Sequence, residues 1–308
     1  MEIKNKVTII GAGMVGSTTA YSLIAANITE EIALIDLNQK LVKSQVMDLQ
    51  HSVPLWGYTR VKVGNYTDIK DSKIVAITCG VSQKSGDTRL DLVKKNSAII
   101  KEIVPKIFKQ NPKVIVVVVT NPVDVLTHQI VKMFPSKKNQ IMGSGTILDS
   151  ARFRFLLSQK LKVNPLNVHA YIVGEHGDSE LPLWSTADVG GTPLDKFKKI
   201  STAEKKKIFN QTKNAAYTII EGKQATYYAI GAVITQLAKA ILFDRKTVLP
   251  ISRLFQGEYG ISDICLSLPA VIGRQGIINK INPEISATEK NQLKRSAQKL
   301  KKAFQSIK

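Results

Sequence analysis

The segment Lys6–Gly16, which reads KVTIIGAGMVG, decides the fold of this chain. An apolar, strand-like run, Lys6–Ile10, leads into three glycines spaced as GxGxxG, and a helical pattern opens after Gly13. Strand, glycine turn and helix in this order are typical of the first βαβ unit of a dinucleotide-binding domain. The first glycine makes the tight turn, the second lets the backbone approach a pyrophosphate, and the third permits close packing of the helix.

A carboxylate at the end of the next predicted strand supports this interpretation. Asp36 follows Gly16 by 20 residues, where its oxygens can accept hydrogen bonds from the hydroxyls of an adenosine ribose. The same charge would repel a 2′-phosphate, and Leu37 and Asn38 offer no guanidinium to hold one. The sequence therefore predicts NAD as cofactor; a glycine turn that only packs a helix on a sheet is the alternative. The predicted cofactor-binding residues of this segment are Gly11, Gly13, Met14, Val15, Gly16 and Asp36.

Strand-like and helix-like segments alternate through the first half of the chain. Continuous Val/Ile runs such as Val114–Val119 indicate strands that helices cover on both faces. After about Gly143 the pattern becomes a mixture of helices, short strands and turns. We therefore expect an α/β fold: a doubly wound parallel sheet of the Rossmann type that binds NAD in residues 1–143, and an α+β substrate domain in residues 144–308, with a cleft between them. The expected strands are 6–10, 32–35, 74–77, 114–119 and 169–173, and the expected helices follow Gly13 and span 94–109 and 148–160.

Composition disfavours several other classes of protein. With 308 residues, 44% of them hydrophobic, the chain can bury a sizeable core. The sequence does not open like a secretory signal, and its longest aliphatic run is far shorter than the roughly 20 residues of a transmembrane helix. Cys79 and Cys265 stand beside apolar residues and in no metal-binding spacing. We expect buried thiols rather than a disulfide, no metal site, and a cytoplasmic location.

The net charge of +20 favours anionic partners, so a non-catalytic protein that binds nucleic acid or another polyanion is the alternative from a different class. The lysines are scattered, however, and the denser groups Lys196–Lys207 and Lys290–Lys308 carry no aromatic-interleaved basic motif. The second group predicts an amphipathic helix docked on the protein, because four apolar residues share a helical spacing: Leu293, Ala297, Leu300 and Phe304. We therefore expect a solvated basic surface without a nucleic-acid or membrane partner.

Four further motifs follow one another along the chain. They are the run Gln83–Leu92 and the segments Thr120–Asp124 (TNPVD), Leu148–Arg152 (LDSAR) and Gly174–Asp178 (GEHGD). Through essentially its whole length the chain resembles the lactate/malate dehydrogenase superfamily, and within it the bacterial L-lactate dehydrogenases. The resemblance implies reversible hydride transfer between NADH and a 2-oxo acid, with pyruvate and L-lactate as the substrate pair.

The resemblance assigns proton transfer to His176 and Asp149. His176 would donate the proton when the keto group is reduced and accept it in the reverse direction, which suits an imidazole because its pKa lies near neutrality. Asp149 would orient the imidazole and stabilise its charged form. Arg152 lies three residues further, on the same helix face, and its guanidinium can grip a substrate carboxylate with two parallel hydrogen bonds. A structural histidine, a helix-terminal acid and a surface arginine are the alternatives.

Asn121 and Arg89 complete the implied catalytic site. By resemblance Asn121 helps to position the substrate and contacts the cofactor, and its peptide bond to Pro122 is cis; capping of a turn is the alternative. The segment Val81–Arg89 has the polar, glycine-containing character of a mobile lid. Closure of the lid would bring Arg89 to the substrate carbonyl, polarise it and expel water. An ordinary solvated loop arginine is the alternative for Arg89.

Three residues are expected to set specificity and cofactor contact. By resemblance Gln83 faces the substituent on C2 of the substrate, and a neutral side chain there leaves a second carboxylate unpaired, which favours pyruvate over oxaloacetate. Thr226 would narrow the pocket and Ile230 would pack against the nicotinamide ring; helix-core packing explains these two residues equally well. A broader L-2-hydroxycarboxylate dehydrogenase, or a malate dehydrogenase, is the alternative within the family.

Arg154 and His169 match positions at which many bacterial relatives bind fructose 1,6-bisphosphate across a subunit interface. Two residues along a helix rotate the side chain by about 200°, so Arg154 cannot serve the same cleft as Arg152. The two residues are therefore either an allosteric anion site in a homotetramer or dimer, or a surface arginine and a packed histidine.

Overall fold

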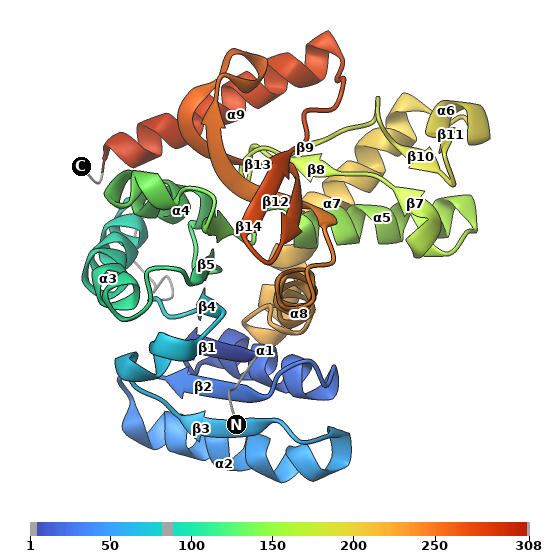
Figure 1. Ribbon diagram of the computed structural model, residues 1–308. Helices are drawn as coiled ribbons and strands as arrows, with labels where there is room; N and C mark the ends of the chain where they lie inside the picture. The colour runs from blue at the N-terminus through green and yellow to red at the C-terminus, as the bar shows by residue number, and fades with distance from the viewer. Residues whose placement is uncertain (1–4, 82–88, 307–308) are drawn as a thin grey trace.

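The computed structural model describes residues 5–81 and 89–306 (Figure 1). At the centre of this part of the chain lies a nine-stranded sheet in the order β14-β13-β12-β6-β5-β4-β1-β2-β3. The six strands β1 to β6 are parallel to one another, and their order in the sheet is that of a doubly wound dinucleotide-binding sheet. The α/β class and the Rossmann sheet predicted from the sequence are therefore confirmed. The six strands are β1 (Lys6–Ile10), β2 (Glu31–Ile35), β3 (Arg60–Val63), β4 (Ile74–Ile77), β5 (Ile115–Val118) and β6 (Ile141–Gly143).

Helices cover both faces of the parallel strands because these strands are apolar on both sides. Val7 and Ile9 belong to one core cluster, and Val75 and Ile77 belong to the cluster on the opposite face. All four side chains are buried. The first face packs against α1 (Met14–Ala25), α2 (Gln39–Trp56) and α8 (Tyr228–Leu242), and the second against α3 (Arg89–Gln110) and α4 (Val123–Met133).

The second half of the chain extends the same sheet, a feature that the sequence analysis did not predict. Ser252 pairs with Gly143, so β12 joins the edge of β6 in antiparallel direction. Two antiparallel pairings then add the remaining strands. The two predicted domains consequently share one continuous sheet. The added strands are β12 (Thr247–Gln256), β13 (Ser262–Gly273) and β14 (Gly276–Lys280).

One predicted strand is wrong. Residues 169–173 were expected to form a single strand, but Val168–His169 (β7) pairs with β10 (Asp188–Val189), and Ile172–Val173 (β8) pairs with β9 (Leu181–Pro182). The chain changes pairing partner between these two strands. The carbonyl of Ile172 accepts hydrogen bonds from the hydroxyls of Thr146, which precedes the helix Ile147–Leu161, and of Ser150 within that helix. The remaining elements are β11 (Thr192–Pro193), α5 (Ile147–Leu161), α6 (Leu194–Phe197), α7 (Thr202–Lys223), α9 (Ala287–Gln305) and the short 3₁₀ helices η1 (Tyr66–Asp71), η2 (Pro135–Lys137), η3 (Pro165–Asn167) and η4 (Glu258–Gly260).

The C-terminal helix α9 is docked as predicted. Leu293, Ala297 and Leu300 are buried in a cluster with β13 and β9, and Phe304 packs at the edge of that cluster. In the described part of the chain, no helix combines the length and the apolar character needed to cross a membrane. Both cysteines are free thiols; Cys265 is buried, whereas Cys79 is only partly so.

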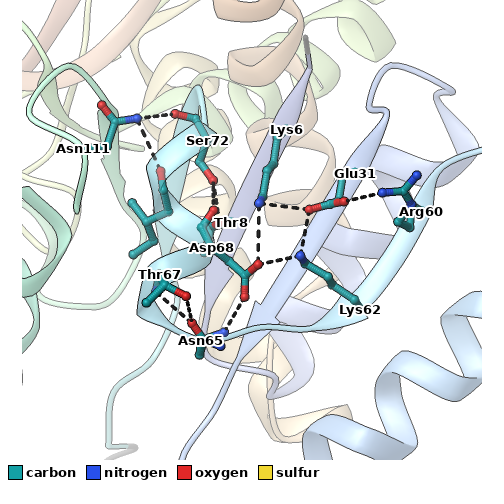
Figure 2. Close-up of polar contacts among 11 residues, drawn as sticks. Lys6, Thr8, Glu31, Arg60, Lys62, Asn65, Thr67, Asp68, Ser72 and Asn111 are labelled. Carbon is teal, nitrogen blue, oxygen red and sulfur yellow. Dashed lines mark hydrogen bonds and ion pairs between the residues drawn. The ribbon is translucent and has the colours of Figure 1, made fainter. Parts of the chain in front are cut away.

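A buried ionic cluster closes the amino ends of β1, β2 and β3 (Figure 2). Glu31 Oε1 lies 3.0 Å from Lys6 Nζ and 3.2 Å from Lys62 Nζ, and Asp68 of η1 binds the same two ammonium groups. Arg60 reaches Glu31 Oε2 from the exposed side at 3.2 Å. Although burial favours the neutral acid, the two lysines hold the pKa of Glu31 below its usual range. This cluster lies at the sheet edge opposite the glycine loop.

Candidate active site

The glycine loop has the geometry that the motif predicts. Gly11 has φ of +109°, and a Cβ there would lie 2.5 Å from the nitrogen of Cys79. A Cβ at Gly16 would lie 1.9 Å from the carbonyl oxygen of Gly11, so the third glycine permits the close approach of α1. Around Gly13, by contrast, no described atom lies within 4 Å of an added Cβ. The loop is therefore packed at its first and third glycines and open at the second, where a pyrophosphate would approach.

The donor set around this opening fits an anion. Gly13 caps α1 without a side-chain hydrogen bond, and the first turn of the helix carries no acidic residue. The first backbone N–H groups of the helix and its positive dipole end are thus directed to the opening. Asp36 follows β2, and its carboxylate accepts hydrogen bonds from the backbone of Ala12 (2.7 Å) and Asn38 (2.8 Å), which hold it beside the loop. These residues fit NAD, and they would hold its pyrophosphate and adenosine ribose.

A cavity of about 510 Å³ lies beyond the carboxyl ends of β5 and β6. Its lining combines side chains from α5, from the loop after β8, from α7 and from α9. The wall includes apolar residues of α3 and α9 as well as polar and charged groups. The polar and charged residues of the lining include Asn121, Asp149, Arg152, His176, Glu180 and Lys213.

His176 and Asp149 form the pair that the sequence analysis expected. The ring nitrogen Nδ1 lies 2.6 Å from Asp149 Oδ2, and the His176 side chain is 25% exposed. Burial disfavours the imidazolium, but the charge and hydrogen bond of Asp149 outweigh it and raise the pKa of His176 to about 9. His176 also keeps the pKa of Asp149 below its usual range despite burial. Because the carboxylate accepts at Nδ1, the opposite nitrogen Nε2 is the one that can exchange a proton with a ligand.

Arg152 shares the carboxylate of Asp149. Its Nη1 donates to Asp149 Oδ1 at 3.0 Å, across one turn of α5. The three charged groups of Arg152, Asp149 and His176 therefore form one connected network that lines the cavity. A guanidinium has five N–H donors, so the contact with Asp149 leaves further donors for a planar carboxylate ligand.

Asp124 is a site residue to which the sequence analysis gave no role, although it stands in the TNPVD segment. It lies in the first turn of α4 and is 2% exposed. Its Oδ2 accepts a hydrogen bond from the backbone nitrogen of His176 at 2.7 Å, and Ser252 Oγ donates to Oδ1 at 2.5 Å. Burial raises the pKa of Asp124 to about 6 despite these hydrogen bonds. Asp124 thus positions the histidine through its main chain, whereas Asp149 positions the ring.

The C-terminal helix holds the other side of the histidine loop. The backbone N–H of Glu175 donates to Ser296 Oγ of α9 at 2.8 Å, and the Ser179 hydroxyl lies 3.1 Å from the same oxygen. Lys299 of α9 forms an ion pair with Glu175 at 3.0 Å. Ser296 is fully buried. Residues about 120 positions away in the sequence therefore hold the loop that carries His176. No local sequence pattern predicted this contact.

The remaining predicted residues lie around this site in different ways. Asn121 lines the cavity, its carbonyl accepts a hydrogen bond from Asn96, and its peptide bond to Pro122 is cis, as expected. Ile230 and Val15 pack against the same core cluster, so α8 and the first turn of α1 are neighbours there. Thr226 lies in the connection between α7 and α8, and it is not among the residues that line the cavity.

Gln83 and most of the expected lid lie outside the described residues. Arg89 is the first residue of α3, and its side chain is also outside the described part. Arg154 points away from the cavity, as the helix geometry predicts: its Nη2 donates to the carbonyl of Pro165 at 3.2 Å. His169 is exposed on β7. The structure therefore brings together His176, Asp149, Arg152 and Asn121, and it leaves the two candidate effector residues outside the cavity.

A doubly wound sheet with a dinucleotide-type glycine loop, together with a cavity that holds a hydrogen-bonded histidine–aspartate pair, defines the class of this protein, an NAD-dependent oxidoreductase. Residues 5–143 match the family described as lactate/malate dehydrogenase, NAD binding domain. Residues 146–308 match the family described as lactate/malate dehydrogenase, alpha/beta C-terminal domain. The chain therefore belongs to the lactate/malate dehydrogenase family.

Known proteins are similar to this chain over nearly its whole length. An L-lactate dehydrogenase of Acetivibrio thermocellus is 44% identical over 99% of this chain and 98% of its own length. An L-lactate dehydrogenase of a Thermoanaerobacter species is 43% identical over 98% of this chain and 99% of its own. Among solved structures, the minor L-lactate dehydrogenase of Enterococcus mundtii has a TM-score of 0.95 at 38% identity, with 99% of both chains covered.

Proposed function

We propose that this chain is an L-lactate dehydrogenase, which catalyses the reversible reduction of pyruvate to L-lactate with NADH. The observation that carries the proposal is the connected His176–Asp149–Arg152 network in one cavity. It combines a proton donor with a cation for a carboxylate, the two groups that a 2-oxo monocarboxylate requires. The full-length similarity to L-lactate dehydrogenases supports the same substrate pair.

Each charged residue of the cavity has a separate role in the proposed reaction. Arg152 binds the carboxylate and fixes the orientation of the adjacent keto group. His176, charged at neutral pH because its pKa is raised to about 9, donates the proton from Nε2 to the keto oxygen. Asp149 stabilises the imidazolium before the transfer and keeps Nδ1 protonated after it. When bound at the glycine loop, NADH supplies the hydride that completes the reduction.

Four assignments complete the proposed substrate and cofactor contacts. Gln83 selects a neutral substituent on C2 and so favours pyruvate, and Arg89 polarises the keto group when the lid closes. Thr226 limits the size of that substituent. Ile230, which packs against the same core cluster as Val15, supports the nicotinamide ring.

The proposal includes the assembly and its regulation. We propose a cytoplasmic homotetramer or dimer in which Arg154 and His169 bind fructose 1,6-bisphosphate at a subunit interface. Among the described residues, the buried Nε of Arg154 has no hydrogen-bond partner, which is consistent with an anion ligand or a partner subunit at that side chain. We also propose that the nucleotide-binding and substrate domains divide at residues 143 and 144.

The test is the initial rate of NADH oxidation with pyruvate and with oxaloacetate in parallel, each with and without fructose 1,6-bisphosphate. A strong preference for pyruvate, together with the loss of turnover in His176→Asn, supports the proposed function. Preference for oxaloacetate would make the chain a malate dehydrogenase, and no turnover on either acid would overturn the enzyme assignment. If the bisphosphate leaves both the pyruvate saturation curve and the oligomer distribution unchanged, the effector site is wrong.

A further inference from the structure

A second buried carboxyl group, that of Glu180, lies in the wall of the cavity and has no role in the proposed reaction. Glu180 immediately precedes β9 and is only 7% exposed. Within residues 5–81 and 89–306, its buried Oε1 has no hydrogen-bond partner. An ionised carboxylate in such a place loses its hydration without compensation. Glu180 is therefore poised to change its charge when its surroundings change.

Charged groups from three directions face Glu180. Helix α5 contributes the Asp149 carboxylate and the Arg152 guanidinium, the loop after β8 contributes His176, and α7 contributes the Lys213 ammonium. Burial and the charge of Asp149 raise the pKa of Glu180 to about 8, although the three cations act in the opposite direction. Lys213 is itself held by the carbonyl oxygen of Asp178 at 2.7 Å. The carboxyl of Glu180 thus shares its electrostatic surroundings with the proposed substrate site.

A 2-oxo acid brings one more negative charge to Arg152. In a cavity of low dielectric, two anions that share one guanidinium raise each other's proton affinity, so the weaker acid is neutralised. We propose that Glu180 takes up one proton when the carboxylate of the substrate binds at Arg152 and releases it when the product leaves. This inference rests on the proposed function, because it takes the ligand to be a monocarboxylate with a neighbouring keto or hydroxyl group.

The proton on Glu180 stays outside the chemical step. Pyruvate and L-lactate are both monoanions, so the charge at Arg152 does not change while the hydride is transferred. The proton that reaches the keto oxygen still comes from His176, and the proton on Glu180 comes from solvent and returns to it. Glu180 therefore acts on the affinity for the substrate and its pH dependence rather than on the reaction itself.

The sign of the pH dependence follows from linkage. Below its pKa of about 8 Glu180 is already neutral, and binding takes up no proton there. Above that pH one proton must be taken up, and the dissociation constant for a monocarboxylate rises about tenfold for each further pH unit. His176 titrates about one unit higher, so its own contribution begins later.

The experiment uses oxamate, which carries the carboxylate and carbonyl of pyruvate but is not reduced. Oxamate is titrated calorimetrically into the NADH complex at pH 8 in two buffers of different ionisation enthalpy, which yields the number of protons taken up. For the wild type we expect about half a proton, of which His176 accounts for only about a tenth, because it is already mostly charged. In Glu180→Gln, which mimics the neutral acid, uptake falls to that small remainder. Glu284→Gln, an exposed carboxyl outside the cavity lining, is the matched control and keeps the wild-type value.

A second readout is the Michaelis constant for pyruvate between pH 7 and 9. We expect it to rise from about pH 8 in the wild type and only from about pH 9 in Glu180→Gln, with similar values for both at pH 7. Uptake of no more than the roughly one tenth of a proton due to His176 in the wild type at pH 8, or uptake that is unchanged in Glu180→Gln, overturns the inference. The wild-type measurement decides even if the variant does not fold. If oxamate does not bind the NADH complex at all, the proposed function fails and this inference fails with it, whereas intact binding without uptake rejects this inference alone.

Discussion

Two buried groups of charged side chains lie at opposite edges of the parallel sheet and differ in how completely they are paired. At the amino edge, Glu31 is in contact with three cations, and Asp68 binds two of the same lysines. At the carboxyl edge, Asp149 serves both His176 and Arg152, and these side chains line an open cavity. The first group is a closed network, whereas the second retains hydrogen-bonding capacity toward a ligand.

The difference shows how the same residue types serve stability in one place and reactivity in another. In the amino-edge cluster, Glu31 and Asp68 keep low pKa values because they are surrounded by partners, so their charge stays constant around neutral pH. In the cavity, the charge and hydrogen bond of Asp149 raise the pKa of His176 to about 9 against the effect of burial, and burial together with the charge of Asp149 raises the pKa of Glu180 to about 8. Groups whose pKa values are shifted toward neutral pH can gain or lose a proton when a substrate binds or reacts. Four experiments test this contrast, beginning with the largest effect.

Replacement of the histidine should abolish turnover without removing the cofactor site. We expect His176→Asn to lower kcat for pyruvate reduction about 10³-fold, because the proton donor is lost, and to leave NADH affinity unchanged. Steady-state kinetics and a fluorescence titration of NADH measure the two properties. A rate within tenfold of wild type would show that His176 is not the proton donor. Loss of NADH binding would show that the cavity does not work separately from the nucleotide loop.

The amino-edge cluster should affect stability alone. We expect Glu31→Gln to lower the free energy of unfolding by about 3 kcal/mol, because the buried Lys6 and the partly exposed Lys62 lose their shared carboxylate, while kcat of the folded fraction is unchanged. Urea unfolding measures the loss. Arg60→Met is the control: its side chain is 69% exposed, so its ion pair with Glu31 should contribute less than about 1 kcal/mol. A loss of activity in folded Glu31→Gln would break the comparison.

The two edges should also respond to pH in different ranges. Because the pKa of His176 is raised, its pairing with Asp149 stabilises the fold fully below about pH 6.5 and loses this contribution as the pH rises through about 9. The lowered pKa values of Glu31 and Asp68 act in the opposite range, so their contribution is lost only in acid. We expect the difference in unfolding free energy between wild type and His176→Asn to shrink by about 2 kcal/mol between pH 6.5 and 9. A constant difference over that range would contradict the raised pKa.

The smallest effect is expected where α9 holds the histidine loop. Ser296→Ala removes the acceptor of the Glu175 backbone N–H, which costs about 1 kcal/mol of stability and lowers kcat a few-fold through displacement of His176. If Ser296 had only a structural role, the folded variant would keep the kcat and the Michaelis constant of the wild type. A lower kcat at an unchanged Michaelis constant for pyruvate therefore identifies the positioning role. Lys299→Met, which removes a half-exposed ion pair with the same Glu175, should change kcat less.

The parts predicted correctly from the sequence depend on short-range signals. The spacing of Gly11, Gly13 and Gly16 and the distance to Asp36 describe one βαβ unit, whose geometry the local backbone determines. The pairing of Asp149 with Arg152 follows from one turn of helix, and the meeting of Asp149 with His176 was implied by family resemblance. The strand expected at residues 169–173 was wrong because its two ends pair with different strands, which hydrophobic pattern alone does not encode.

The sequence by itself determined the cofactor loop and the class of the sheet, because both depend on local spacing, and the resemblance of its motifs to a family implied the pair of His176 and Asp149. Only the tertiary structure decided which groups support that pair. Asp124 and Ser296 reach the histidine loop from elements 52 and about 120 residues away, and Glu180 became a titratable neighbour of Arg152 only through burial in the same cavity. Burial and long-range contact set the protonation of such groups, and both arise only when distant segments pack together.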